Sequence, residues 1–230
     1  MRFDQHILKF FAALDFPVPL PGGIEVMIPF ADKATLQATQ LFYKKYYHDT
    51  LQRRMIIGIN PGRFGGGVTG IPFTDPIRLQ NDCGIKNNWP KKQELSSLYV
   101  YDMIHAFGGP ARFYQQYYIT SVSPLGFTLA GKNLNYYDDK KLQESIKSFV
   151  IDCFHKQFAF GIDRSTAFCL GDGKNFKYLS ALNKEQSLFE KIIPLPHPRF
   201  IMQYKLKSKQ QYIDRYITAL SEGIGPARPF

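Results

Sequence analysis

Two short motifs contain the side chains best suited to a reaction or to ligand binding. Asn60 stands in the sequence Gly-Ile-Asn-Pro-Gly of residues 58–62, directly after the apolar run 55–57. His197 stands much later, in the sequence Leu-Pro-His-Pro-Arg of residues 195–199. An amide offers both a hydrogen-bond donor and an acceptor, and an imidazole can do the same in its neutral form. Such side chains suit the orientation of a ligand or a water molecule.

A predicted strand precedes each of these residues. The short apolar run 55–57 predicts a buried strand, and Ile192 and Ile193 predict a last strand that ends at Pro194. Open α/β sheets place their ligands at the carboxyl ends of the strands. Each motif alone has a simpler interpretation, a plain turn for the first and an incidental loop histidine for the second. Together they favour a site.

The rest of the chain predicts helices that alternate with strands. Helices are expected over 1–16, 33–48, 96–107, from 110, 138–160, 174–182 and 208–221, and strands over 53–59, 117–122, 167–170 and 192–193. This alternation implies parallel pairing and a three-layer α/β/α sandwich with a central, mainly parallel four-stranded sheet. A long irregular stretch is expected from the glycine-rich loop to residue 93. We expect one domain over 1–230, with a core of about 50–222, N-terminal helices packed on it and an irregular tail over 223–230.

Composition restricts the class of protein and its partners. The 230 residues carry a formal net charge of +10, which favours a polyanion such as DNA, although charge alone also fits a basic protein kept soluble by repulsion. No apolar run is long enough to span a membrane, and the N-terminus lacks the pattern of a signal peptide, so a cytoplasmic location is expected. The three scattered cysteines form no pair typical of a metal site, and no metal or cofactor is implied.

A family resemblance rests on both motifs and on two strings between them. The first motif extends to G-I-N-P-G-x-F-G-x-x-x-T-G-I-P-F, Ser-Pro-Leu stands at 123–125, and Gly-Lys-Asn-Leu stands at 131–134. With the later His-Pro, these strings resemble the single-strand-selective monofunctional branch of the uracil-DNA glycosylase superfamily over about residues 56–220. The mismatch-specific thymine/uracil branch shares the Gly-Ile-Asn-Pro-Gly string, but the His-Pro favours the first branch.

The resemblance implies a fold, a reaction and two catalytic residues. Glycosylases of this kind cleave the N-glycosidic bond, which makes the sugar cation-like and places negative charge on the departing base. By resemblance, His197 donates to the base oxygen that gains charge, and Asn60 positions the attacking water. Asn cannot be a general base, so the reaction would depend on stabilisation of the leaving group. The product would be an abasic site, because neither motif positions a lysine as a nucleophile.

The same resemblance implies a pocket for a flipped base. Phe73 would stack on the base, although one phenylalanine among twenty could equally belong to the core. Ser121 departs from the family, which has an asparagine there to read uracil. Because a serine is shorter and has one hydroxyl, we expect a looser pocket that also admits xanthine or hypoxanthine. The expected base-binding residues are Gly58, Ile59, Gly62, Phe64, Gly65, Phe73 and Ser121.

Contacts with the DNA backbone are expected next to His197. Arg199 and Phe200 are candidates for the side chain that fills the gap left by a flipped base, but a loop that returns Phe200 and Ile201 to the core is an equal alternative. The expected DNA-binding residues are Pro198, Arg199, Phe200, Lys205, Lys207 and, at the start of a helix, Lys174.

Two other classes of function remain open from the sequence. A phosphate hydrolase could use the glycine-rich loop, but the Lys-Ser/Thr of a P-loop is missing. A non-catalytic DNA-binding protein on a degenerate glycosylase fold is the stronger alternative, because charge and abundant aromatic residues suit a stacking groove. For an enzyme acting on DNA, a monomer is the default expectation.

Overall fold

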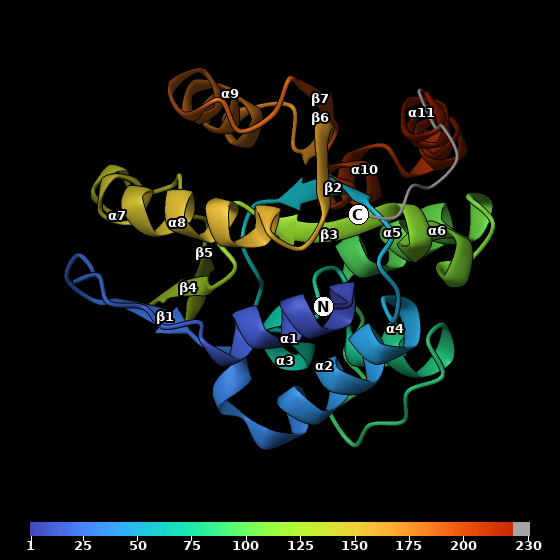
Figure 1. Ribbon diagram of the computed structural model, residues 1–230, viewed down its shortest axis with the longest axis horizontal. Coiled ribbons are helices and arrows are strands. Elements are labelled where there is room, and N and C mark those ends of the chain that lie inside the picture. The colour runs from blue at the N-terminus through green and yellow to red at the C-terminus, as the bar shows by residue number, and fades with distance from the viewer. Residues whose placement is uncertain (223–230) are drawn as a thin grey trace.

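The computed structural model describes residues 1–222 and contains two sheets surrounded by helices (Figure 1). The strands are β1 Ile24–Met27, β2 Arg53–Gly58, β3 Tyr117–Ser121, β4 Gly126–Leu129, β5 Lys132–Leu134, β6 Ile162–Leu170 and β7 Lys191–Leu195. The α-helices are α1 Phe3–Ala12, α2 Lys33–Tyr46, α3 Gly66–Thr69, α4 Pro76–Asn81, α5 Leu95–Ala106, α6 Pro110–Gln116, α7 Lys140–Ser145, α8 Lys147–Phe158, α9 Lys174–Gln186, α10 Pro198–Tyr204 and α11 Lys209–Ser221. Two short 3-10 helices are η1 Pro29–Ala31 and η2 Leu206–Ser208.

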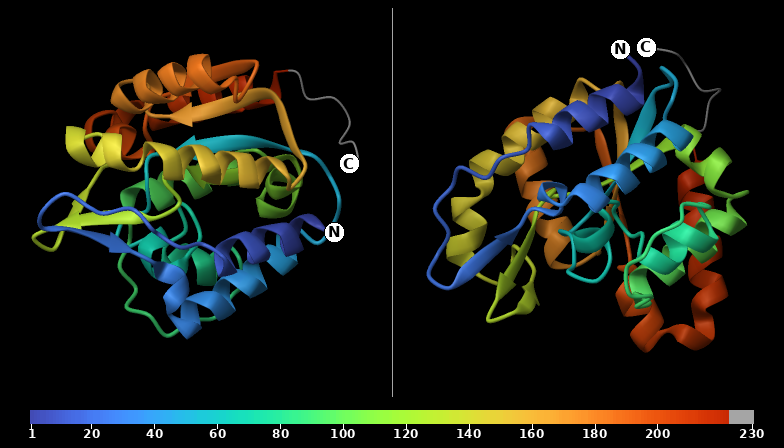
Figure 2. Two further views of the ribbon diagram at one scale, coloured as in Figure 1. Left: turned by 60° about the vertical axis from the view of Figure 1, so that its left-hand side comes forward. Right: turned by 90° about the horizontal axis from the view of Figure 1, so that it is seen from below.

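The larger sheet is entirely parallel and has the order β3-β2-β6-β7. The chain passes from β2 to β3 on one side and then crosses to β6 and β7 on the other. Since parallel crossovers are right-handed, this reversal places α5 and α6 on one face and α8 and α9 on the other, as Figures 1 and 2 show. The predicted three-layer α/β/α sandwich is therefore confirmed, and a topological switch point lies at β2.

The smaller sheet was not predicted from the sequence. It is antiparallel, with the order β1-β4-β5, and its strands contain only three or four residues each. Such short segments are too brief to show a reliable alternation of apolar and polar residues. This sheet is nonetheless important, because β5 lies against the loop that follows β2.

Three local predictions need correction. The helix expected over 138–160, with Asp138 as its cap, is two helices, α7 and α8. The cap of α7 is Asp139, whose carboxylate accepts from the N–H of Leu142. The stretch up to residue 93 contains α3 and α4 rather than only irregular chain. The chain after His197 forms α10, with Pro198 at its first position, where proline is favoured.

The centre of the core is built from β2 and the N-terminal helices. Met55, Ile56 and Ile57 are buried, as the apolar run predicted. Arg53 is also completely buried, and its guanidinium lies 4.5 Å from the ring centre of Phe3 on α1 and 4.7 Å from that of Tyr47. A salt bridge of 2.8 Å to Asp49 balances its charge. This cluster attaches the N-terminal helix to the amino end of β2, the end of the strand opposite the site.

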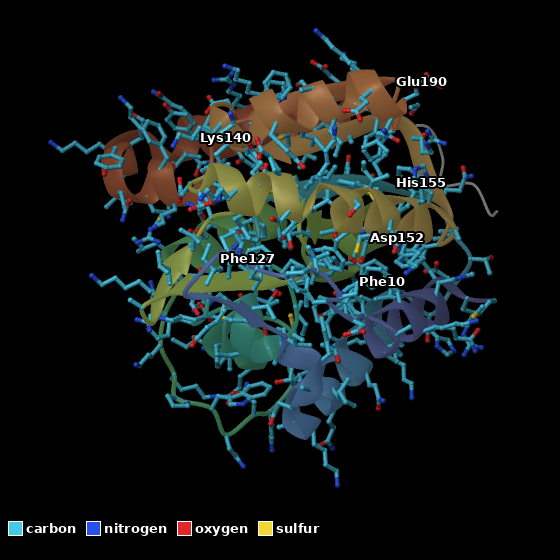
Figure 3. All side chains as sticks on the ribbon, turned by 90° about the vertical axis from the view of Figure 1, so that its left-hand side faces the viewer. Phe10, Phe127, Lys140, Asp152, His155 and Glu190 are labelled. Atoms are coloured by element: carbon cyan, nitrogen blue, oxygen red, sulfur yellow. The ribbon has the colours of Figure 1, made fainter. Side chains whose placement is uncertain are left out.

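A groove lies between α1 and α8 on the side of the molecule shown in Figure 3, where Phe10 and Asp152 are labelled. It encloses about 730 Å³ and shares no lining residue with the site described below.

Within residues 1–222, no helix combines the length and the apolar character required to cross a bilayer. The expectation of one domain stays a prediction, and its tail over 223–230 lies outside the described residues.

Candidate active site

A cavity of about 460 Å³ opens at the carboxyl ends of the parallel strands. All four strands contribute to it: Asn60 follows β2, Ser121 ends β3, Gly171 follows β6, and His197 follows β7. The parallel register aligns these ends, because Gly58 pairs with Ser121 and Leu170 pairs with Leu195. The two motifs, separated by more than half of the chain, therefore meet in one cavity of a size usual for ligand sites.

His197 is held as a neutral imidazole with a defined tautomer. It is the N-cap of α10, and its Nδ1 accepts a hydrogen bond of 3.1 Å from the backbone N–H of Arg199. An Nδ1 that accepts carries no proton, so the proton of the neutral ring is on Nε2. Burial, together with the positive charge of Arg199, lowers the pKa of His197 to about 4. The site thus contains an uncharged imidazole whose Nε2–H remains available as a donor.

The backbone around His197 is fixed by two other elements. The Tyr216 hydroxyl on α11 donates to the Pro196 carbonyl, and the Gly171 N–H donates to the Leu195 carbonyl at 2.7 Å. Gly171 has a φ of +110°, a conformation that an L-residue with a side chain rarely adopts. His197 therefore stands on a loop whose carbonyl groups are bound by neighbouring elements.

Asn60 is fixed by β5 and the residues after it. Its Nδ2 donates to the Leu134 carbonyl at 3.2 Å, and its Oδ1 accepts from the Tyr136 N–H at 3.0 Å. A carbonyl oxygen has two lone pairs, so Oδ1 can accept one further hydrogen bond. The hairpin that β5 forms with β4 also binds the loop beyond Asn60, because Asn133 Oδ1 accepts from the Arg63 N–H at 3.1 Å. The amide is thus oriented by backbone groups before any ligand arrives.

Phe73 lies against the end of β2 in a strained conformation. Its φ of +53° is in the left-handed region, which a phenylalanine seldom occupies. A Cβ atom at Gly58 would lie 2.8 Å from the Phe73 ring, so only glycine allows the ring this close to the strand. The Thr69 hydroxyl holds the turn by donating to the Thr74 carbonyl at 2.6 Å. The ring centre is 6.1 Å from that of His197, on the wall of the cavity.

Ser121 and Glu94 supply two further polar groups on the cavity wall. The side chain of Ser121 is 5% exposed and lies beside Gly58. Glu94 precedes α5, and its carboxylate covers the turn at Gly62 and Gly65 while accepting from the Ser97 hydroxyl at 3.3 Å. Burial raises the pKa of Glu94. Glu94 was not predicted as a site residue, because its only local signal is a carboxylate just before a helix.

The structure brings most, but not all, of the predicted site residues to this cavity. The predicted residues that line it are Asn60, Ile59, Gly62, Phe73, Ser121, Lys174, His197, Arg199 and Phe200. Gly58 lies behind the Phe73 ring, and Gly65 lies beneath Glu94. Phe64 does not line the cavity: it is 41% exposed, with Arg63 at 4.6 Å and Lys92 at 4.9 Å from its ring centre. The turn that follows Pro61 directs it outward.

Of the predicted DNA-binding residues, Lys174, Arg199 and Phe200 line the cavity, whereas Pro198, Lys205 and Lys207 do not. On α10, Pro198 is buried, Arg199 is exposed and Phe200 is 43% exposed. The alternative that returned Phe200 and Ile201 to the core is therefore wrong for Phe200 and correct only for Ile201. Ile201 is the residue that enters the core. Lys205 and Lys207 are exposed beyond the lining. Tyr204, which the sequence analysis did not single out, is 71% exposed and lies 5.6 Å from Phe200, ring centre to ring centre.

Two observations limit the chemistry of the cavity. Lys174 at its rim is exposed, and its ammonium lies 3.6 Å from Asp138, so it lacks the desolvation that activates a Schiff-base lysine. Among residues 1–222, no group of three or more His, Cys, Asp and Glu side chains could hold a metal ion.

Comparisons with known proteins show the family to which this chain belongs. The family model described as the uracil DNA glycosylase superfamily matches residues 45–221. Among solved structures, the crystal structure of wild-type SMUG2 from Pedobacter heparinus matches with a TM-score of 0.93 and 48% sequence identity, covering 95% of this chain and 97% of that chain. No curated protein matches. The resemblance found in the two motifs is confirmed, and the chain belongs to the uracil-DNA glycosylase superfamily.

Proposed function

We propose that this protein is a monofunctional DNA glycosylase that excises uracil from DNA and leaves an abasic site for base excision repair. The observation that carries this proposal is the pair formed by a neutral, oriented His197 and a fixed Asn60 at one cavity. Membership in the superfamily supports the same activity. The enzyme would act as a monomer in the cytoplasm without a cofactor, which stays a prediction.

His197 would stabilise the departing base. As the N-glycosidic bond breaks, negative charge develops on a base oxygen, and a neutral Nε2–H aimed at that oxygen lowers the barrier. A positioned donor of this kind typically contributes about 3 kcal/mol. A neutral imidazole also avoids the cost of burying a cation before the base arrives.

Asn60 would position the water that attacks the sugar. Its Oδ1 already accepts from the Tyr136 N–H, and the remaining lone pair can bind one water proton. Because an amide does not take up the proton of that water, the reaction depends mainly on stabilisation of the leaving base. The barrier would be crossed late in bond breaking, with a cation-like sugar.

Phe73 and Ser121 would set the range of bases. The Phe73 ring offers a stacking surface for a flipped base, and Ser121 offers one hydroxyl where the family has an amide. A single short hydroxyl discriminates less than a paired amide contact, so xanthine and hypoxanthine are proposed as additional substrates. On the DNA side, Arg199 and Phe200 would fill the gap left by the base, and Pro198 would start the helix that carries them. Lys174, Lys205 and Lys207 would meet phosphates.

The test is excision from labelled oligonucleotides that carry one uracil, xanthine or hypoxanthine, single- and double-stranded. Asn60→Ala and His197→Ala should each slow excision about a hundredfold or more. His155→Ala is the matched control, because His155 is an exposed histidine on α8 (Figure 3) and does not line the cavity. The strand should remain intact until alkali or heat is applied, and borohydride should trap no covalent complex. Binding without excision on every substrate would instead support the non-catalytic DNA-binding alternative.

A further inference from the structure

A buried chain of hydrogen bonds connects the Asn60 loop with the strand end beside His197. The backbone N–H of Tyr136 donates to Asn60 Oδ1 at 3.0 Å, and the hydroxyl of the same tyrosine donates to Asn175 Oδ1 at 2.7 Å. Asn175 Nδ2 in turn donates to the Leu170 carbonyl at 3.0 Å, at the end of β6. Tyr136 thus contacts Asn60 through its backbone and α9 through its side chain.

The two side chains that form these hydrogen bonds are almost completely removed from solvent. Tyr136 is 0% exposed and Asn175 is 2% exposed. Burial raises the pKa of the Tyr136 hydroxyl, which therefore stays protonated and remains a donor. Since Asn175 Oδ1 accepts this proton, its Nδ2 must face the Leu170 carbonyl, and the amide has one defined orientation.

The far end of this chain of hydrogen bonds reaches His197 through a glycine. A Cβ atom at Gly171 would lie 3.3 Å from Asn175 Cβ and 3.8 Å from His197 Cδ2, so Gly171 is packed between the two side chains. Gly171 also donates to the Leu195 carbonyl, two residues before His197. Asn175 therefore supports the backbone against which the imidazole rests.

We propose that Tyr136 and Asn175 are positioning residues, which set the distance and orientation between Asn60 and His197. The inference rests on the proposed glycosylase function, in which these two side chains act on opposite sides of one glycosidic bond. Their separation must then match the reacting geometry closely, and a misplacement of about 1 Å can slow a reaction roughly a hundredfold. Tyr136 couples the hairpin that holds Asn60 to the helix that supports His197.

Tyr136→Phe tests this proposal by removing the hydroxyl alone. The expected result is a single-turnover excision rate on uracil that falls roughly ten- to a hundredfold, with KM changed by less than about twofold. Tyr178→Phe is the matched control: Tyr178 lies 4.9 Å from Tyr136 between ring centres, and its buried hydroxyl has no hydrogen-bond partner within residues 1–222. The control should excise at the wild-type rate.

Double variants separate positioning from a general loss of structure. In an Asn60→Ala background, Tyr136→Phe should slow excision by less than about twofold, because the side chain that it positions is already missing. As a single substitution, Asn175→Ala should slow excision. Adding Tyr136→Phe to Asn175→Ala should hardly change the excision rate further, since the two groups act through one hydrogen bond. Thermal unfolding of each variant reports whether the folded fraction changes.

The outcomes distinguish this inference from the proposed function. If the wild-type protein excises uracil and the Tyr136→Phe variant is equally active, the inference is overturned but the proposed function is not. An equal slowing by Tyr136→Phe with and without Asn60 would also overturn it and indicate a structural role. Wild-type protein that excises no base would overturn the proposed function and this inference with it.

Discussion

The neutral state of His197 leads to a prediction about pH. Burial and the Arg199 charge lower its pKa from an ordinary 6.5 to about 4, and Nδ1 is occupied as an acceptor. At 1.36 kcal/mol for each pKa unit, protonation of His197 in the folded protein costs about 3 kcal/mol more than in the unfolded chain. Excision should therefore be independent of His197 titration from pH 8 down to about 5 and should decline as pH approaches 4.

The same shift predicts how stability depends on pH. Between pH 6.5 and about 4 the unfolded chain binds a proton at this histidine and the folded chain does not, so the free energy of unfolding falls as pH falls. Up to about 3 kcal/mol of stability is lost across this window, and none of it is lost above the unfolded pKa. In His197→Gln this contribution is absent, so the pH dependence of the difference between the two proteins isolates it.

The measurement combines an NMR titration with single-turnover kinetics. The chain has five histidines, and the signal missing from His197→Gln assigns the relevant one. The reasoning would be refuted by a His197 signal that titrates near pH 6.5. It would equally be refuted by a wild-type excision rate that rises on acidification through pH 6.5 in a manner absent from His197→Gln, because the imidazolium would then be the donor.

Four further predictions follow from single contacts. Asn60→Asp replaces the Nδ2 that donates to the Leu134 carbonyl with an oxygen that repels it, so single-turnover excision should slow at least about tenfold, and a faster rate would contradict the role of that contact. Ser121→Asn should lower excision of xanthine relative to uracil at least about tenfold, and an unchanged ratio would show that Ser121 does not set the base range. Lys174→Ala should reduce the slope of log affinity for DNA against log salt by about one, whereas Lys140→Ala, which is exposed outside the cavity lining, should leave it unchanged. Arg53→Ala should reduce the free energy of unfolding by about 3 kcal/mol, measured with denaturant, because Asp49 loses its buried partner; a loss below about 1 kcal/mol would contradict this assignment.

Local sequence signals were sufficient for the parallel sheet and for the two motifs. An apolar run bounded by glycine and proline identifies a strand, and the alternation of such runs with helical periodicity specifies the parallel sandwich. Because carboxyl ends of parallel strands share one edge, Asn60 and His197 could be placed together before any coordinates. The start of α10 was also encoded, by Pro198 at its first position, but the helix is only seven residues long and was taken as a loop.

The predictions that failed concerned residues and strands whose contacts lie far away in the sequence. The strands of the smaller sheet are too short to show periodicity, so the hairpin that orients Asn60 was missed. Phe64 was placed in the pocket by resemblance, whereas the turn after Pro61 leaves it exposed beside two cations. Glu94 carried no distinctive local pattern.

Local periodicity and turn residues specify the type of each element, so they also specify which residue types stand at the strand ends. The orientation of those residues, in contrast, depends on contacts between distant segments. Asn60 is held by Tyr136, 76 positions later, and Tyr136 is held by Asn175, another 39 positions later. The tautomer of His197 depends on a helix N-terminus and on burial. Hydrogen bonds and desolvation of this kind arise only when distant segments pack together, so no local pattern encodes them.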